Sequence, residues 1–138
     1  MKVAVRYYTQ TGNTRKLCDA IASALGVEAK SVEAPLEEAV DLLFLGSSVY
    51  AAGIDPAVKN FINNLEPSKV GSVVNISTAA LLPSTYNQVK KLLTARNIPV
   101  CPEEFHCRGQ FHALHKGKPD AADIDAAVSF AKKMTGAQ

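Results

Sequence analysis

The sequence predicts an α/β protein with one open parallel β-sheet that helices cover on both faces. Short apolar runs alternate with segments of helical periodicity, and Gly, Pro, Asn and Ser separate them. Two runs, near 41–46 and 71–77, are largely apolar, as expected of central strands buried on both faces. A length of 138 residues fits one domain, residues 1–138, with its own core.

Five strands are expected, near 2–8, 27–32, 41–46, 71–77 and 100–106. The run at 27–32 alternates apolar with polar and charged side chains, which is typical of a strand at the edge of a sheet. The runs at 41–46 and 71–77 belong in the centre. A strand order of 2-1-3-4-5 satisfies both conditions and completes a five-stranded parallel sheet.

Helices are expected between the strands, except over 33–39, which is too short to predict one with assurance. Apolar stripes mark the sides that pack on the sheet: Leu17, Ile21 and Leu25 in one helix, and Val58, Phe61, Ile62 and Leu65 in another. Asp55 and Pro56 supply an N-cap and a first-turn proline. The last helix, near 120–134, has acidic residues in its first turns and Lys132 and Lys133 in its last, which suits the helix dipole.

A hydroxyl-rich turn lies between the first strand and the first helix. We call it the phosphate turn, and it consists of Thr9, Gln10, Thr11, Gly12, Asn13 and Thr14. The first N–H groups of a helix lack internal partners and carry part of a positive charge, so an anion completes such a turn. No Lys or Arg lies within it. Hydrogen bonds must therefore hold the anion.

The motif Thr-x-Thr-Gly-Asn-Thr at 9–14 resembles the FMN-phosphate loop of flavodoxins. Leu45–Tyr50 and Cys107–Phe111 resemble later segments of the same family in the same order, so the resemblance covers nearly the whole chain. The chain is thus similar to the flavodoxin-like FMN-binding family, of its short-chain type. The resemblance implies a flavodoxin-like three-layer sandwich with FMN as cofactor.

Ligands of open parallel sheets bind beyond the carboxyl ends of strands where the strand order reverses, here between the first and third strands. We predict that the phosphate turn holds phosphate and that two further loops line the flavin ring. No catalytic side chain and no metal ligand is predicted. The cofactor-binding residues are Thr9, Gln10, Thr11, Gly12, Asn13 and Thr14 at the phosphate, Ser48, Val49, Tyr50, Ala51, Ala52 and Gly53 on one side of the ring, and Thr78, Ala79 and Ala80 nearer the other.

The chain lacks the residues that four other classes of α/β protein require. A dinucleotide-binding turn needs Gly-x-Gly-x-x-Gly, whereas Gly12 stands alone, and an NTPase needs Gly-Lys-Ser/Thr, whereas Gly117-Lys118 precedes Pro119. A receiver domain needs carboxylates after the first and third strands. A phosphotyrosine phosphatase needs a cysteine in the first loop, and Cys18 lies well inside the helix.

Composition restricts partners and location. The net charge of +2 comes without a Lys/Arg block, which argues against nucleic acid. No apolar run approaches the roughly 18 residues of a membrane span, and no secretory signal is visible. Three cysteines suit reduced thiols, and the Cys and His residues of 101–115 lack zinc-site spacing. We expect a cytoplasmic monomer that binds neither nucleic acid nor membrane.

The favoured function is an FMN electron carrier between a reductase and an acceptor protein. The alternative is a flavin-dependent oxidoreductase, such as a quinone reductase or a protoporphyrinogen oxidase of flavodoxin-like kind. The mild positive charge and the absence of acidic and aromatic residues from Ser77–Leu82 favour that enzyme, whereas the lack of a long insertion favours the carrier. A scaffold that has lost its flavin is a third, less favoured reading.

Overall fold

A five-stranded parallel sheet of order β2-β1-β3-β4-β5 forms the middle layer of the protein, as predicted. The structure is a computed structural model that describes residues 1–49, 53–79, 84–110 and 115–136. β2 is an edge strand, and β3 and β4 lie in the interior of the sheet. The strands are β1 (Val3–Tyr7), β2 (Ala29–Ser31), β3 (Val40–Val49), β4 (Val70–Ala79) and β5 (Phe105–Arg108).

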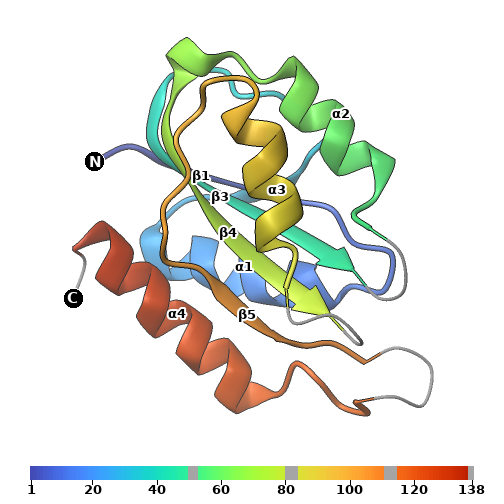
Figure 1. The fold of residues 1–138 in the computed structure, drawn as a ribbon. Helices are drawn as coiled ribbons and strands as arrows, with labels where there is room; N and C mark the ends of the chain where they lie inside the picture. The colour runs from blue at the N-terminus through green and yellow to red at the C-terminus, as the bar shows by residue number, and fades with distance from the viewer. Residues whose placement is uncertain (50–52, 80–83, 111–114, 137–138) are drawn as a thin grey trace.

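In the described ranges, four helices complete the three layers. α1 (Asn13–Leu25) and α4 (Ala121–Thr135) cover one face of the sheet, and α2 (Pro56–Asn64) and α3 (Tyr86–Thr94) cover the other (Figure 1). A short 3-10 turn, η1 (Pro67–Lys69), leads into β4. The expected caps of α2 are present, because Asp55 accepts a hydrogen bond from Ala57 N and Pro56 opens the helix.

Two hydrophobic clusters fill the spaces between the layers. Successive side chains of β3 alternate between them, with Leu42 and Phe44 facing α1 and α4, and Leu43 and Leu45 facing α2 and α3. These four side chains are buried. The apolar run of β3 is therefore explained by burial on both faces.

The two central strands extend further at their carboxyl ends than the sequence predicted. β3 continues to Val49 and β4 to Ala79, because Ser48 pairs with Thr78 and Val49 with Ala79 in the ladder. Ser48, Val49, Thr78 and Ala79 are thus strand residues and not loop residues. The two central strands therefore include residues that were predicted to belong to the cofactor site.

The fifth strand was predicted at 100–106 and lies at Phe105–Arg108. Val100 forms only an isolated bridge to Val73. Pro102 follows, and it has no N–H with which to continue the ladder. Pairing with β4 resumes at Phe105, in a register displaced by two residues.

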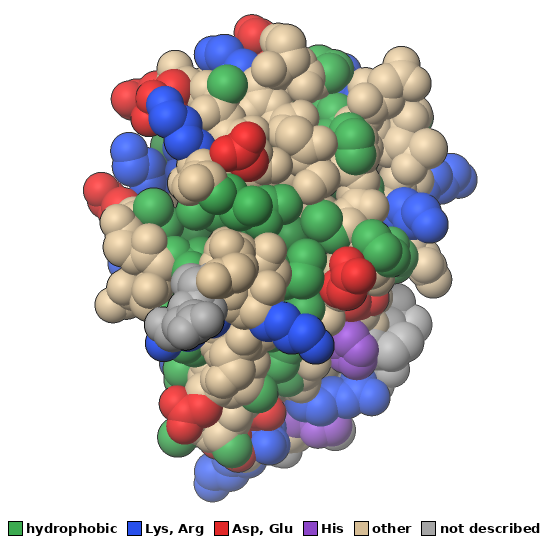
Figure 2. All heavy atoms as spheres, turned by 90° about the vertical axis from the view of Figure 1, so that its left-hand side faces the viewer, with side chains coloured by type: hydrophobic (Ala, Val, Ile, Leu, Met, Phe, Trp, Pro, Cys, Tyr) green, Lys and Arg blue, Asp and Glu red, His purple; other side chains and the backbone are tan. Residues whose placement is uncertain are grey.

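The face at the amino ends of the strands has mixed character. Figure 2 shows a band of hydrophobic side chains across this face, with basic and acidic side chains scattered around it. One exposed ion pair, between Lys2 Nζ and Glu38 Oε2, spans 2.9 Å. Within the described ranges, no helix has the length and apolar character needed to cross a bilayer.

The connection from β2 to β3 crosses the sheet without a helix. Residues 32–39 are all described, and they form turns and extended chain. The Arg6 guanidinium, on a residue only 6% exposed, donates to Ala34 O at 2.8 Å, Pro35 O at 3.0 Å and Val5 O at 3.0 Å. Burial lowers the pKa of Arg6, yet a guanidinium stays charged at neutral pH. Arg6 thus replaces a crossover helix as the anchor of this segment.

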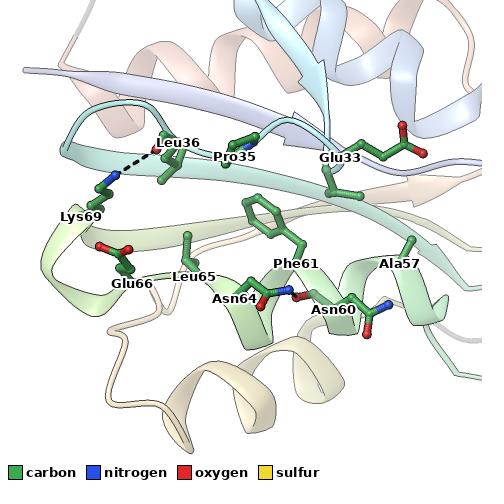
Figure 3. Close-up of a pocket in the computed structure, with 11 residues that line it drawn as sticks. Glu33, Pro35, Leu36, Ala57, Asn60, Phe61, Asn64, Leu65, Glu66 and Lys69 are labelled. Atoms are coloured by element: carbon green, nitrogen blue, oxygen red, sulfur yellow. Dashed lines mark hydrogen bonds between the residues drawn. The ribbon is translucent and has the colours of Figure 1, made fainter.

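A groove of about 570 Å³ separates this connection from α2 (Figure 3). Its floor is apolar and consists of Leu36, Phe61 and Leu65, which are themselves buried. At one end Lys69 Nζ donates to Leu36 O at 3.3 Å. The groove follows from the absence of a crossover helix at this position.

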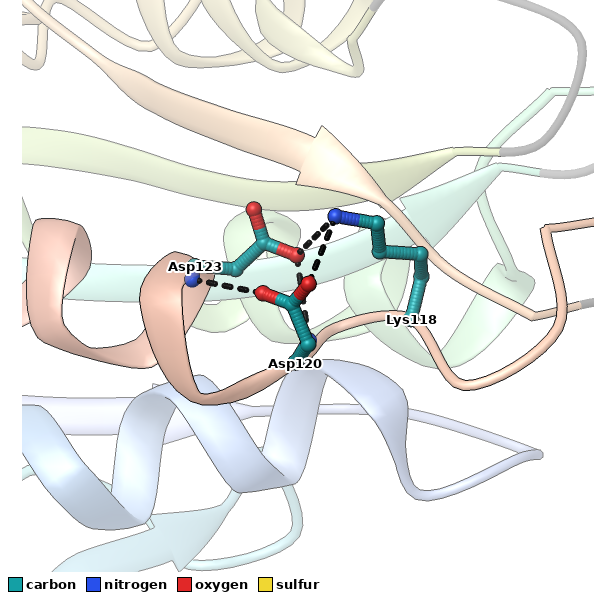
Figure 4. Close-up of polar contacts among 3 residues, drawn as sticks. All are labelled: Lys118, Asp120 and Asp123. Atoms are coloured by element: carbon teal, nitrogen blue, oxygen red, sulfur yellow. Dashed lines mark hydrogen bonds and ion pairs between the residues drawn. The ribbon is translucent and has the colours of Figure 1, made fainter.

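α4 begins with a capping box, which confirms its predicted start. Asp120 Oδ1 accepts from Asp123 N, and Asp123 Oδ2 accepts from Asp120 N, both at 3.0 Å. Lys118 Nζ donates to Asp120 at 2.9 Å and lies 3.3 Å from Asp123 Oδ2 (Figure 4). These bonds raise the pKa of Lys118, and the Lys118 bond is the main cause that lowers the pKa of Asp120 to about 2.

The lowered pKa of Asp120 predicts a specific acid dependence of stability. Because the folded-state pKa lies below the unfolded value of about 3.9, the contribution is complete above that pH and disappears as pH falls through about 2. Asp120→Asn keeps a good N-cap but removes the charge. Thermal melts of both proteins at successively lower pH should show their difference shrinking over this window. A constant difference would contradict the assignment.

Candidate functional site

The phosphate turn joins β1 to α1 at the carboxyl edge of the sheet. Gly12, its turning residue, has a φ of 87° and is the N-cap of α1, so the N-cap position has no side chain to cap the helix. Thr11 Oγ1 accepts from Asn13 N at 3.4 Å. Thr9 Oγ1 accepts from Gly12 N at 3.1 Å and keeps its own proton for donation. A Cβ built at Gly12 would meet none of the described residues within 4 Å. The described part of the chain therefore leaves space at the positive end of the helix.

The last two residues of the turn face the protein. Asn13, 4% exposed, donates from Nδ2 to Gln110 O at 2.9 Å. Thr14 is fully buried, and its Oγ1 donates to Ser47 O at 3.2 Å and lies 2.9 Å from Thr78 Oγ1. These side chains hold the turn against the sheet and the segment after β5. The sequence motif alone does not show that these two side chains point toward the protein.

Gln10 links the phosphate turn to the start of α2. Its Nε2 donates to Asp55 Oδ2 at 3.1 Å, while Asp55 Oδ1 accepts from Ala57 N at 2.9 Å. Asp55 therefore caps a helix and holds the turn at the same time. The sequence identified its capping role only.

The end of β3 and the segment that follows it contain the second group of predicted residues. Ser48 is partly exposed, Val49 is buried, and Gly53 is exposed with a φ of 40°. Gln88 on α3 accepts from Ile54 N through Oε1 at 2.9 Å, so it fixes the chain next to Gly53. Sequence reasoning missed Gln88, because it is a single polar residue in a helix. The predicted residues Tyr50, Ala51 and Ala52 lie outside the described residues.

The end of β4 brings the third group to the same edge. Thr78 and Ala79 are fully buried, and Ala79 O accepts from Gly109 N at 3.3 Å. Ala80 lies outside the described residues. The described members of all three predicted groups thus gather at one edge of the sheet, around the ends of β1, β3 and β4.

Gln110 organises the segment after β5, and the sequence prediction did not include it. Its N–H donates to Lys118 O at 2.8 Å, and its Oε1 accepts from Gly117 N at 2.9 Å. Because Gln110 O also accepts from Asn13, the 115–118 turn is connected to the phosphate turn. The only signal was its place in the segment that resembled the family.

Two of the three cysteines, Cys18 and Cys107, lie in environments that disfavour a nucleophile. Burial raises the pKa of Cys18 far above its ordinary value and that of Cys107 to about 12. A thiol is reactive as the thiolate, which these environments disfavour. Across the described ranges, no three His, Cys, Asp or Glu side chains gather as metal ligands.

Solved structures share the architecture of this chain at low sequence identity. Flavodoxin 2 from Bacillus cereus is 17% identical with a TM-score of 0.73, over 99% of both chains. A flavodoxin from the domain Archaea is 14% identical with a TM-score of 0.74, over 98% of this chain and 99% of that one. At such identities the likeness shows the fold.

A third solved structure contains the same fold within a larger enzyme. The rubredoxin oxygen:oxidoreductase of Desulfovibrio gigas is 14% identical with a TM-score of 0.72, over 95% of this chain but 34% of that chain. A search of curated proteins finds no match. The family model described as "Flavodoxin domain" matches residues 4–109, more than half of the chain. The chain therefore belongs to the flavodoxin domain family, whose cofactor is FMN and whose general role is electron transfer.

Proposed function

We propose that this protein is a flavodoxin-like carrier that holds one FMN noncovalently and passes electrons from a reductase to an acceptor protein. The observation that carries the proposal is the amino end of α1, which none of the described residues covers at Gly12 and which lies beside hydroxyl groups. That end lies where strand order reverses between β1 and β3. This is the expected position of a nucleotide phosphate in an open parallel sheet.

The residues present fit a phosphate without a cation. Thr9, Gln10 and Thr11 would surround it with hydroxyl, amide and backbone donors, and Gly12 would let the backbone approach it closely. Asn13 and Thr14 would hold the turn in shape through their bonds to the rest of the protein. The helix dipole supplies a partial positive charge at the same point. Hydrogen bonds and the dipole together would neutralise the phosphate.

The flavin ring would lie beyond the paired carboxyl ends of β3 and β4. The partly exposed Ser48 and the exposed Gly53 would contact one side together with Tyr50, Ala51 and Ala52, and Ala80 would lie nearer the other. Val49, Thr78 and Ala79 are buried, so they would support these loops and not touch the ring. Bound FMN supplies the redox chemistry, and the protein supplies binding, orientation and exclusion of water. No side chain is required as an acid or base.

The carboxylate of Asp55 is the acidic group that we expect to act on the flavin. It is bonded to Gln10 and to the first turn of α2, so its position is fixed. Few carboxylates near the ring impose a small Coulomb penalty on added negative charge. We therefore infer a fully reduced couple less negative than that of acidic flavodoxins, with the protein working as a monomer in the cytoplasm.

A flavin-dependent oxidoreductase, of the quinone-reductase or protoporphyrinogen-oxidase kind, is the second candidate. The net charge of +2 favours it, because a carrier of the usual type presents an acidic surface to its partners. Such an enzyme would exchange reducing equivalents directly with a small substrate, passing them to a quinone or taking them from a protoporphyrinogen for transfer to another acceptor. Its FMN would be held by the same residues.

Rapid mixing distinguishes the two functions. The FMN-loaded protein is mixed with NADH or NADPH, alone and with a catalytic amount of a flavodoxin reductase, while the flavin absorbance is followed. A carrier keeps its flavin oxidised with nicotinamide alone and is bleached once the reductase is added. Direct bleaching supports the enzyme. A protein that is colourless once unbound FMN has been removed contradicts both the carrier and the enzyme.

A further inference from the structure

Six polar residues are completely buried beneath the carboxyl edge of the sheet. Burying polar groups is unfavourable unless they are hydrogen-bonded to one another, so such a cluster needs a reason. We call it the hydroxyl network, and it consists of Thr14, Ser47, Asn75, Ser77, Thr78 and Thr85. All its members lie on α1, β3, β4 or immediately before α3.

One half of the hydroxyl network holds α1. Thr14, in the first turn of that helix, donates to Ser47 O and lies 2.9 Å from Thr78 Oγ1. Thr14 is also the last residue of the phosphate turn. The position of the turn therefore depends on the ends of β3 and β4.

The other half holds the start of α3 on the opposite face of the sheet. Thr85 Oγ1 accepts from Ser47 Oγ at 2.8 Å and from Asn75 Nδ2 at 3.0 Å. Thr85 N donates to Ser77 Oγ at 3.4 Å. The Thr85 hydroxyl is thus surrounded by groups of β3 and β4.

Thr85 gives up its ordinary local role for these bonds. It occupies the N-cap of α3, where a threonine hydroxyl usually accepts from the first turn of the helix. Among the described residues, no side-chain cap bond is made there. The hydroxyl turns into the sheet instead.

Ser47 connects the two halves. Its carbonyl accepts from Thr14 of α1, and its side-chain hydroxyl donates to Thr85 beside α3. The chain Thr14–Ser47–Thr85 therefore runs through the sheet from the phosphate turn to the opposite helix layer. Because every member is buried, loss of one bond leaves its partners without water to replace it.

We propose that Thr85 is a positioning residue for the phosphate of FMN, acting through Ser47 on the phosphate turn from the far side of the sheet. The proposal rests on the proposed FMN binding and adds a residue that touches no part of the ligand. If Thr85 had only a structural role, its loss would destabilise the fold and lower the affinities for FMN and riboflavin equally. Positioning of the turn concerns the phosphate specifically.

The test compares FMN with riboflavin in wild type and in Thr85→Val, which keeps the shape and removes the hydroxyl. Calorimetric titration should show the ratio of FMN to riboflavin affinity falling about 10-fold in the variant. Thr85→Ser should restore the ratio. Ser47→Ala, which removes the bridging hydroxyl alone, should lower it in the same way and serves if Thr85→Val folds poorly.

Two controls make the result decisive. Val89→Ala removes buried volume from the same helix outside the hydroxyl network and should leave the ratio unchanged. In flavin-free protein, amide hydrogen exchange in the first turn of α1 should accelerate in Thr85→Val and not in Val89→Ala. That readout stands even if the protein binds no FMN, an outcome that would refute the proposed function alone. The inference would be overturned if Thr85→Val left the ratio of FMN to riboflavin affinity unchanged, including by lowering both affinities equally. Unchanged amide hydrogen exchange in the first turn of α1 would also overturn it.

Discussion

Replacing Gly46 with alanine is expected to weaken FMN binding at least about 10-fold and to destabilise the fold by about 1–3 kcal/mol. Gly46 lies in β3 and faces Thr14 and Cys18 of α1. A Cβ at this position would overlap Cys18 Sγ and lie 2.7 Å from Thr14 Cγ2. Relief requires α1 to move away from β3, and the phosphate turn moves with it. Calorimetric titration and urea unfolding measure the two effects.

Gly71→Ala is the matched control for this prediction. A Cβ at Gly71 would come within 2.5 Å of Asp41 O, at the amino end of β4. It should therefore destabilise the fold as well, but at the end of the sheet remote from the phosphate turn. We expect both variants to be less stable than wild type, and only Gly46→Ala to bind FMN more weakly. Wild-type FMN affinity in Gly46→Ala would show that the contact between α1 and β3 does not set the site.

Arg6→Met is expected to lower the free energy of unfolding by about 2–4 kcal/mol. The substitution removes the donors to Val5 O, Ala34 O and Pro35 O while retaining much of the side-chain volume. Since no helix supports the 32–39 connection, these bonds are its main polar anchor. The free energy of unfolding of Arg6→Lys should lie between those of wild type and Arg6→Met, because an ammonium lacks the planar fork that reaches several carbonyls.

Urea unfolding measures this effect, and Arg15→Met provides the comparison. Arg15 forms an exposed pair with Asp19 at 3.4 Å, which is expected to contribute less than about 1 kcal/mol. Neither variant should change the preference for FMN over riboflavin. A loss in Arg6→Met as small as that in Arg15→Met would show that apolar packing alone holds the connection.

The order of the strands could be predicted because each apolar run carries its own signature. Alternation in β2 marked an edge, and the apolar run of β3 marked the centre. The ends of the strands could not be predicted in the same way. Whether Ser48 and Thr78 continue the ladder depends on their partners in the neighbouring strand, and the displacement of β5 depends on where Pro102 interrupts pairing.

The candidate site was predictable where a residue type carries the chemistry. A turn of hydroxyls before a helix indicates an anion site whatever the rest of the fold. The directions of Asn13 and Thr14, by contrast, follow from partners far along the chain, Gln110 and Thr78. Thr85 and Gln88 belong to no motif, and tertiary hydrogen bonds alone make them important.

The most direct test of the account is calorimetric titration of the flavin-free protein with FMN and with riboflavin under the same conditions. If the phosphate turn holds the phosphate through hydrogen bonds and the α1 dipole, FMN should bind at least about 100-fold more tightly than riboflavin. Equal affinities for the two flavins would contradict the account, because the residues from Thr9 to Thr14 would then contribute nothing to recognition of the phosphate.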